Sequence, residues 1–263
     1  MAKTCEINEY FERVIPSTLR IEDDNVGLLV DNTGSEITKA LVALDITNEV
    51  IDEACELGAG LILSHHPLFF GLREIKNTRA EGMKIIKLIS NNISAICLHT
   101  NLDCVMGGVS DCLLAALGAQ CGGILELSGT APDGAPYGIG RFGELPVALT
   151  MQEFLKNTKT VLKTGGLRYH DSGRPVKKIA CCGGSGGDYI EAAVLHGCDT
   201  YVTADLKYNV FQEAAEFGLN IIDGDHFCTE NVVIPYLAGK LSEGFPEIEV
   251  KISELHGQIV KFF

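Results

Sequence analysis

The stretch LILSHHPLFF (residues 61–70) joins a short apolar run to two adjacent histidines and a proline. An apolar run of four residues that ends at polar ones is typical of a buried β-strand, here 61–64. His65 and His66 follow the carboxyl end of that strand, and Pro67 biases the backbone of His66 toward an extended conformation. By themselves the two imidazoles have two interpretations: metal ligands, or side chains that cap backbone groups in a strand-end turn.

Apolar runs and amphipathic segments alternate on both sides of this stretch. Thr47 and Ser110 are typical N-cap residues, Gly58 is a typical helix end, and Thr150 with Glu153 forms a capping box. The predicted strands are 39–45, 61–64, 94–99, 123–127, 176–182, 200–203 and 219–223. The predicted helices are 7–15, 47–57, 79–90, 110–117, 151–163, 189–196, 206–217 and 230–242, the last distorted by Pro235. This alternation predicts an α/β fold with mainly parallel sheets.

The composition is that of a globular, acidic protein. Of the 263 residues, 46% are hydrophobic and 21% charged, which indicates a compact fold and not a disordered chain. The net charge of −14 argues against a nucleic-acid binder, because phosphate backbones are held by surplus Lys and Arg. The start of the sequence is polar and mixed in charge, unlike a signal peptide, and no apolar run approaches the roughly 20 residues that span a bilayer. We therefore expect a cytoplasmic protein without a membrane partner.

Ten cysteines occur without a CxxC pair, which predicts reduced thiols and no zinc knuckle. The adjacent Cys181 and Cys182 are either a redox pair or buried residues at a strand end. The segment SGTAPDGAPY (128–137) is rich in glycine, proline and small polar residues, and it predicts a linker.

Polar residues with metal-binding side chains follow three of the predicted strands. In open α/β sheets, ligands bind beyond the carboxyl ends of the strands. If the three strands are neighbours on one sheet, these side chains lie within reach of one another. The residues are His65 and His66 after 61–64, His99 and Asp103 after 94–98, and His226 and Glu230 after 219–223.

Imidazole and carboxylate together suit zinc, manganese, iron or cobalt better than calcium or magnesium. Five ligands are too many for one catalytic zinc, and they are enough for two metals that share a bridging carboxylate. The predicted ligands are His65, His66, Asp103, His226 and Glu230. His99 is left as a proton carrier, a partner of a ligand, or a hydrogen-bonded strand-end residue.

Each of these signals also has a purely structural interpretation. Asp103 alone is consistent with a turn or cap residue, and Glu230 with a carboxylate in the first turn of a helix. The segment GGSGGD (183–188) is either an anion cradle or a tight turn, and Asp205 either lines the cleft or caps a helix. The joint position of the ligand candidates at strand ends favours metal binding.

The order of the motifs resembles the Nif-three-like dinuclear metal-centre proteins, known as type 2 GTP cyclohydrolase I homologues. The resemblance covers nearly the whole chain, and His-His-Pro, Asn-Leu-Asp and His-x-x-x-Glu in this order are specific. The motifs are DNVGLLV (24–30), LDIT (44–47), LILSHHPLFF (61–70), HTNLD (99–103), GGSGG (183–187), TADLKYN (203–209) and GDHFCTE (224–230).

The resemblance implies two similar α/β lobes, with the metal site in the cleft at the strand ends and the carboxy-terminal segment returning to the first lobe. With the linker, this places the lobes at 1–127 plus 222–263 and at 128–221. It also implies two divalent ions (zinc, iron or manganese) per subunit on the five predicted ligands, and a homohexamer built as a trimer of dimers. The chain departs from the family at Asn209, where histidine is common, and at Ala204 and Asp225, where glycine is common.

Two functions of different class fit this site. The first is a metal-dependent hydrolase that acts on a nucleotide or phosphoester-like small molecule, with His99 or a carboxylate moving protons. The alternative is a non-enzymatic, hexameric metal-binding or metal-delivery protein. A third interpretation gives the metals a structural role only. The sequence does not name the substrate, and the missing imidazole at Asn209 weakens the transfer of any particular activity.

Overall fold

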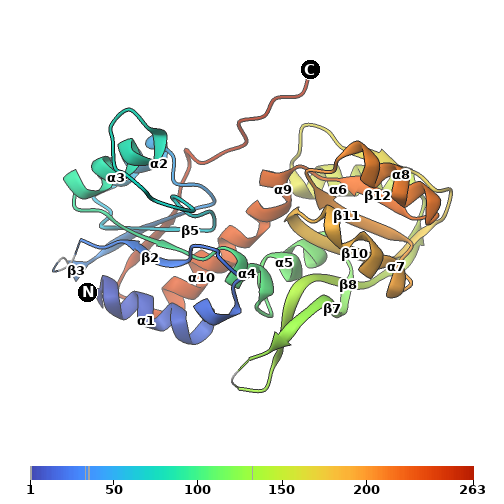
Figure 1. Ribbon diagram of the computed structural model, residues 1–263, viewed down its shortest axis with the longest axis horizontal. Helices are drawn as coiled ribbons and strands as arrows, with labels where there is room; N and C mark the ends of the chain where they lie inside the picture. Colours follow the sequence, from blue (N-terminus) through green and yellow to red (C-terminus); the bar gives the residue numbers. More distant parts are fainter. Residues whose placement is uncertain (1, 33, 35, 132) are drawn as a thin grey trace. The chain divides into compact units, whose positions relative to one another are not determined.

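The computed structural model describes residues 2–32, 34, 36–131 and 133–263. These residues form helices and β-sheets, as the alternating pattern predicts, and they divide into two compact units (Figure 1). Unit 1 extends to Leu102 and resumes over Ile234–Gly257. Unit 2 comprises Asp103–Val233 and Gln258–Phe263.

Unit 1 contains a five-stranded sheet in the order β13-β4-β5-β6-β2. The four strands from β13 to β6 are parallel, and β2 runs antiparallel to β6. All four residues of β5 are buried, which explains why LILS is an unbroken apolar run: a parallel strand with helices on both faces has no polar side. The strands are β2 (Gly27–Val30), β4 (Lys39–Ala43), β5 (Leu61–Ser64), β6 (Ser94–Cys97) and β13 (Glu249–Ile252), with a separate pair β1 (Ala2–Lys3) and β3 (Glu36–Ile37).

Helices cover both faces of this sheet, α2 and α3 on one and α1 and α10 on the other (Figure 1). The ends of α2 are as predicted: the Thr47 side chain accepts a hydrogen bond from the N–H of Val50, and Gly58 adopts a left-handed conformation. The helices are α1 (Thr4–Val14), η1 (Ser17–Leu19), α2 (Asn48–Leu57), α3 (Ala80–Ser90), α4 (Thr100–Cys104), which spans the boundary between the units, and α10 (Ile234–Gly244).

Unit 2 contains a six-stranded mixed sheet in the order β7-β8-β10-β11-β12-β9. Its three central strands are parallel, whereas β7, β8 and β9 are joined by antiparallel pairings. The sequence predicts mainly parallel sheets, so this sheet is more mixed than expected. The strands are β7 (Gln120–Thr130), β8 (Pro136–Leu149), β9 (Arg168–His170), β10 (Val176–Ser185), β11 (Thr200–Ala204) and β12 (Asn220–Asp223).

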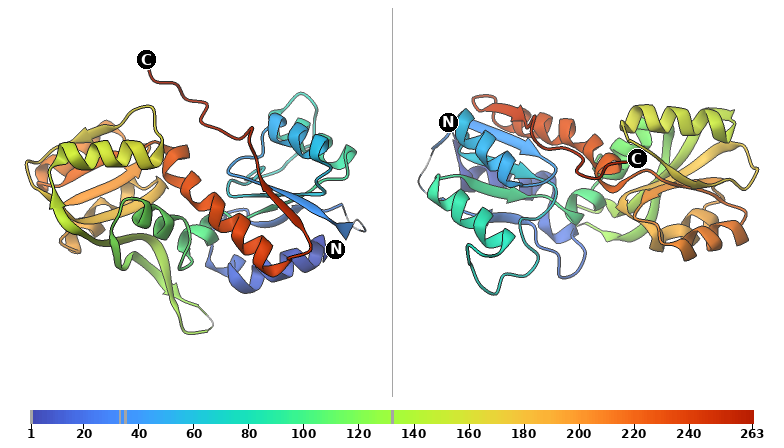
Figure 2. Two further views of the ribbon diagram at one scale, coloured as in Figure 1. Left: turned by 180° about the vertical axis from the view of Figure 1, so that it is seen from behind. Right: turned by 90° about the horizontal axis from the view of Figure 1, so that it is seen from above.

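The helices of unit 2 also lie on both faces of its sheet, with α6 on one face and α7 and α8 on the other (Figure 2). The predicted capping box of Thr150 and Glu153 is present at the start of α6. Helix α5 begins after Gly108, so Ser110 lies inside the helix and is not its cap. The helices are α5 (Val109–Ala116), α6 (Met151–Leu162), η2 (Gly187–Tyr189), α7 (Ile190–Leu195), α8 (Tyr208–Glu216), α9 (His226–Glu230) and η3 (Asn231–Val233).

The segment predicted as a linker, 128–137, is the end of a β-hairpin. Strand β7 reaches Thr130, β8 starts at Pro136, and the two strands pair in antiparallel register (Figure 1). Pro132 of this segment lies outside the described residues. Glycine and proline mark hairpin turns as well as linkers, so composition alone did not separate the two.

The units also differ in their bounds from the predicted lobes. Because β7 pairs with β8, residues 103–127 belong to unit 2 and not to unit 1. Residues 222–233 belong to unit 2 as well, because β12 pairs with β11. The predicted helix 230–242 is broken into η3 and α10 next to Pro235.

All ten cysteines lie in the described part of the chain as free thiols, as predicted. Cys181 and Cys182 are buried in β10, and burial raises the pKa of both thiols well above its ordinary value. Because the thiolate is the reactive form, this favours the buried interpretation over a redox pair. None of the helices formed by the described residues is long and apolar enough to cross a membrane.

A fully buried arginine fixes the segment that leads into α5. The Nε of Arg141, in β8, donates to Asp111 Oδ2 at 2.7 Å. Its Nη1 donates to the carbonyls of Gly138 and Gly140, and its Nη2 donates to the carbonyl of Val105 at 2.8 Å. These four hydrogen bonds use most of the five N–H donors of the buried guanidinium, so Arg141 ties the start of α5 to the sheet.

We expect Arg141→Ala to lower the free energy of unfolding by about 3–5 kcal/mol, because the change leaves the mostly buried carboxylate of Asp111 without its cation. Urea unfolding followed by circular dichroism measures the effect. Arg174 is exposed and donates to one carbonyl, so Arg174→Ala should stay within about 0.5 kcal/mol of the wild type. Equal losses in the two variants would contradict a special role for Arg141.

Candidate metal centre

Three histidines of unit 1 come together at the carboxyl ends of two neighbouring strands. His65 and His66 directly follow β5, and His99 lies two residues after β6. One ring nitrogen of each lies within 4.8 Å of one ring nitrogen of the other two. His65 is fully buried, whereas the side chains of His66 and His99 keep 21% and 18% of their surface exposed. These three residues form a group that could hold a metal ion.

The Nδ1 atom of each of these imidazoles faces a hydrogen-bond acceptor. His65 Nδ1 donates to the carbonyl of Leu98 at 2.8 Å. His66 Nδ1 donates to Asp45 Oδ1 at 2.7 Å, and His99 Nδ1 donates to Asp24 at 2.9 Å. Since a carbonyl or carboxylate only accepts, the proton of each neutral ring is on Nδ1 and the lone pair is on Nε2.

Asp24 is held in its charged form. Burial would raise the pKa of its carboxyl, but hydrogen bonds from His99 and from the side chain and N–H of Thr100 outweigh burial and hold the pKa well below its usual range. An ionised Asp24 fixes the orientation of His99, as carboxylates do behind metal-bound or catalytic histidines.

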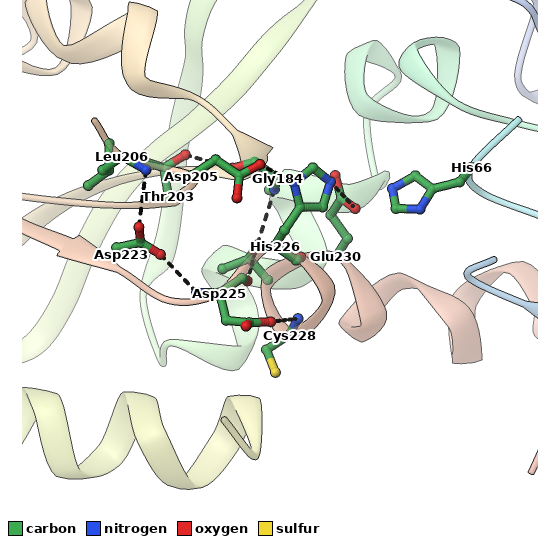
Figure 3. A network of polar contacts seen from close by, with 12 residues as sticks. His66, Gly184, Thr203, Asp205, Leu206, Asp223, Asp225, His226, Cys228 and Glu230 are labelled. Carbon is green, nitrogen blue, oxygen red and sulfur yellow. Dashed lines mark hydrogen bonds and ion pairs between the residues drawn. The ribbon is translucent and has the colours of Figure 1, made fainter. Parts of the chain in front are cut away.

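In unit 2, one imidazole lies between two carboxylates (Figure 3). His226 Nδ1 contacts Asp205 Oδ2 at 2.7 Å, and His226 Nε2 contacts Glu230 Oε2 at 3.1 Å. The hydrogen bond with Glu230 is the main reason that the pKa of His226 rises to about 9, while partial desolvation opposes the rise. Both ring nitrogens therefore carry protons, and a divalent cation would compete with the proton between Nε2 and Glu230.

Helix α9 carries both residues of this pair, and its start is unusual. Its N-cap, Asp225, has a positive φ of 76°, and its side chain accepts a hydrogen bond from the N–H of Cys228. The family resemblance places glycine here, which adopts such a φ without strain. In this chain the strained backbone is offset by the cap and by a further hydrogen bond from Gln258 to Asp225 Oδ1 (Figure 3 shows the cap).

The glycine-rich segment at the end of β10 makes room for the same pair. A Cβ on Gly184, which has a φ of +63°, would come within 2.1 Å of Glu230 Oε1 and 3.2 Å of His226 Nε2. A Cβ on Gly183 would lie 3.3 Å from Glu230 Cγ. The absence of side chains at these glycines therefore lets Glu230 and His226 lie directly against the backbone of β10. The sequence analysis offered an anion cradle or a tight turn for this segment and did not include this role.

Asp103 lies in α4, at the first position of unit 2, and is partly buried. Burial is the main cause that raises the pKa of Cys182, and the charges of Asp103 and Glu230 raise it further. Within unit 2, both carboxylates therefore lie close enough to act on the same thiol.

The sequence analysis made one condition, that the three ligand-bearing strands are neighbours on one sheet, and the structure does not meet it. Strand β12 belongs to the sheet of unit 2, whereas β5 and β6 belong to unit 1. The structure groups His65, His66 and His99 in unit 1 and pairs His226 with Glu230 in unit 2. It also makes His99 a possible ligand, a role that the sequence analysis did not assign to it.

The sequence analysis did not predict which carboxylates form hydrogen bonds with the histidines. Asp45 and Asp24 are partners of His66 and His99, and Asp205 is the partner of His226. All three stand in the quoted motifs LDIT, DNVGLLV and TADLKYN. Asp45 and Asp205 follow β4 and β11 within two residues, so the strand-end rule that found the ligands could also have found these two.

The donor set fits a transition metal. The imidazoles of His65, His66 and His99, with their Nε2 lone pairs, and the carboxylates suit zinc, iron or manganese. Each histidine also has the hydrogen-bonded partner that metal-binding histidines carry. The described residues thus provide His and Glu groups that could hold a metal ion.

Comparison with known proteins identifies the same family that the motifs indicate. A family model described as Duf34/NIF3 (NGG1p interacting factor 3) matches residues 2–258. A Clostridium perfringens protein named GTP cyclohydrolase 1 type 2 homolog is 41% identical over 243 residues, 92% of each chain. A solved Bacillus cereus protein related to NIF3 superposes with a TM-score of 0.91 at 27% identity, over 100% of this chain and 99% of the other. A Staphylococcus aureus hypothetical protein superposes with a TM-score of 0.92 at 29% identity, over 99% of each.

In the metal-free protein we expect His226 to titrate near pH 9, above its unfolded value of 6.5. Because the folded pKa is the higher one, the protonated ring stabilises the fold fully below pH 6.5, and this stabilisation is lost as the pH rises through 9. An NMR titration of the imidazole measures the pKa. Glu230→Gln should lower it more than Asp205→Asn, since the hydrogen bond with Glu230 is the largest cause. A midpoint that does not respond to Glu230→Gln would show that the pair is not formed.

Gly184→Ala should weaken zinc binding about 10–100-fold, the usual cost of disturbing the support of a metal ligand, because the new methyl group displaces the Glu230 carboxylate. Gly187→Ala is the matched control, since a Cβ there meets no atom closer than 3.5 Å. Competition with a chromophoric chelator measures both affinities. If Gly184→Ala folds normally and binds zinc as tightly as Gly187→Ala, the proposed clearance for Glu230 is unnecessary.

Proposed function

The chain belongs to the Duf34/NIF3 family, and on this premise we propose that it binds two divalent metal ions per subunit and uses them to hydrolyse a nucleotide or phosphoester-like small molecule. The proposed ligands are the five predicted from the strand ends. These ligands are His65, His66, Asp103, His226 and Glu230.

One observation carries this proposal: the same hydrogen bond recurs behind the four histidines of the two groups, His65, His66, His99 and His226. His65 is held by a carbonyl, and His66, His99 and His226 are held by carboxylates, always at Nδ1. A purely structural role does not require the supported nitrogen to be Nδ1 in all four histidines. A common Nδ1 contact directs every Nε2 away from its support, which is what a metal site requires.

Two ions bound by these residues would supply Lewis acidity and a nucleophile from water near neutral pH. We assign His99 the transfer of protons, because its Nδ1 is fixed on the ionised Asp24 and its Nε2 carries the lone pair. The partial exposure of His66 and His226 leaves both side chains accessible to a small molecule. The name of the C. perfringens relative, which refers to GTP, supports a nucleotide as the first substrate class to examine.

The same exposure supports a second candidate function, metal storage or delivery without turnover. Carboxylate and imidazole ligands with exposed surface exchange a metal more readily than buried thiolates do. The family resemblance supports a homohexamer, a trimer of dimers, as the assembly in either case. Transfer of metal to an apo-acceptor without turnover of any substrate would favour delivery over hydrolysis.

We expect about two metal ions per subunit after reconstitution with zinc, manganese or iron. Asp103→Ala should lose at least one of them, and kcat/KM on the best substrate of a nucleotide and phosphoester panel should fall by more than about 100-fold, since changes behind a ligand already cost 10–100-fold. Asp133→Ala, at an exposed carboxylate of the β7–β8 hairpin, is the matched control and should behave as wild type.

The same assay separates the two roles open to His99. His99→Gln should keep the full metal content and reduce kcat by about 10²–10⁴-fold, the range for loss of a general acid or base. Loss of metal from His99→Gln would make it a ligand instead. Equal rates for wild type and Asp103→Ala would exclude a hydrolase that works through this centre.

A further inference from the structure

A loop in unit 1 follows the His-His-Pro segment and is fixed at both ends. At its start, Leu68 is buried, and the carbonyl of Phe69 accepts a hydrogen bond from Asn25 Nδ2 at 2.7 Å. At its end, the backbone of Lys76 packs on Gly82 of α3 so closely that a Cβ there would come within 2.2 Å of the Lys76 carbonyl oxygen. The segment between these anchors, 70–75, which we term the aromatic loop, is therefore held in place without regular secondary structure.

The aromatic loop exposes apolar side chains where a purely structural loop would bury or avoid them. Phe70 is 67% exposed, and Leu72 and Ile75 are 41% and 49% exposed. Three such exposed apolar residues occur within six positions of one loop, whereas exposed apolar residues elsewhere are usually scattered singly.

Phe70 brings this surface to the candidate metal centre. Its ring contacts that of His99 edge to face, with centroids 5.7 Å apart and the planes at 65°. His99 in turn lies 5.3 Å from His65 and 5.8 Å from His66, measured between ring centroids. A flat, exposed aromatic ring next to three imidazoles offers a stacking surface for a planar ring of a bound molecule.

The charge of the same region departs from that of the whole chain. The net charge is −14, yet residues 68–79 contain three cationic residues and one acidic residue. Arg73 and Lys76 are exposed, and Glu74 pairs with Lys76 and Arg79. A local excess of positive charge attracts an anion that the rest of the surface repels.

We propose that the aromatic loop is the substrate-recognition element of the candidate metal centre, and that it selects an anionic molecule with a planar heteroaromatic ring. Phe70 stacks on the ring, and Arg73 attracts the anionic group. This inference rests on the proposed function, because the site must act on a nucleotide-like molecule. It adds the side chains that determine which molecule binds, and these side chains are not among the metal ligands.

The test is equilibrium binding of guanosine 5′-monophosphate to the metal-loaded full chain, with ribose 5-phosphate as a probe that has the anion and no ring. Phe70→Ala should weaken binding of the nucleotide about tenfold, within the range for loss of one base–aromatic stack, and leave binding of ribose 5-phosphate unchanged. Phe70→Trp should restore nucleotide binding. Leu72→Ala is the matched control, because it removes an exposed apolar side chain of the same loop without an aromatic ring.

Metal content is measured for every variant. Unchanged nucleotide binding in Phe70→Ala overturns the inference, as does an equal loss for ribose 5-phosphate or an absence of nucleotide binding by wild type. These results would leave the proposed function standing if wild type holds two metals and its turnover depends on Asp103. A chain that holds no metal would instead overturn the proposed function, whatever the effect of Phe70→Ala on the nucleotide.

Discussion

The candidate centre depends on one repeated interaction, the hydrogen bond between a histidine Nδ1 and an acceptor at a strand end. An imidazole on a flexible bond would otherwise rotate and present either nitrogen, and only a fixed tautomer offers a constant lone pair. In unit 1 the acceptors come from the strand neighbours of β5: Asp45 follows β4, and Leu98 follows β6. Parallel pairing therefore brings each histidine close to its hydrogen-bond acceptor, since adjacent parallel strands end at the same edge of the sheet. In unit 2 the support of His226, Asp205, follows β11, the neighbour of β12.

The helices and strands for which all local sequence signals indicate the same structure were predictable from the sequence. The strand LILS and the helix between Thr47 and Gly58 have the predicted bounds, because an apolar run, an N-cap and a left-handed glycine all indicate the same structure. The hairpin at 128–137 was not predictable, because its residues also suit a linker and its strand β7 is mostly exposed, without the alternation that identifies a half-buried strand. The edge strand β13 has four residues, as β5 does, but EVKI is mostly exposed and is not an apolar run, so this strand exists through pairing with a neighbour.

The ligand types and their places at strand ends were predictable, because a histidine or carboxylate directly after an apolar strand is visible in the sequence. The sheet to which each strand belongs was not, since strand order is set by pairings between distant segments. This is why the sequence left open whether the strand at 219–223 lies beside the strand at 61–64. The contribution of Gly184 was also hidden: its clearance for Glu230 joins residues 46 positions apart, and glycine in a turn has many simpler reasons. The supporting role of Asp24 needed the fold for the same reason, because 75 residues separate it from His99.

The discontinuous course of unit 1 has a consequence for how the protein is made. Its edge strand β13 pairs with β4 over residues more than 200 positions earlier in the chain. During synthesis, β4, β5 and β6 therefore leave the ribosome long before the strand that completes their sheet, and the hydrogen-bonding edge of β4 has to wait for it. Unit 2 is translated almost entirely within that interval. Translation that stops before β13 consequently leaves β4 unpaired on one side, so residues 249–252 decide whether the sheet formed by residues before 103 can be completed.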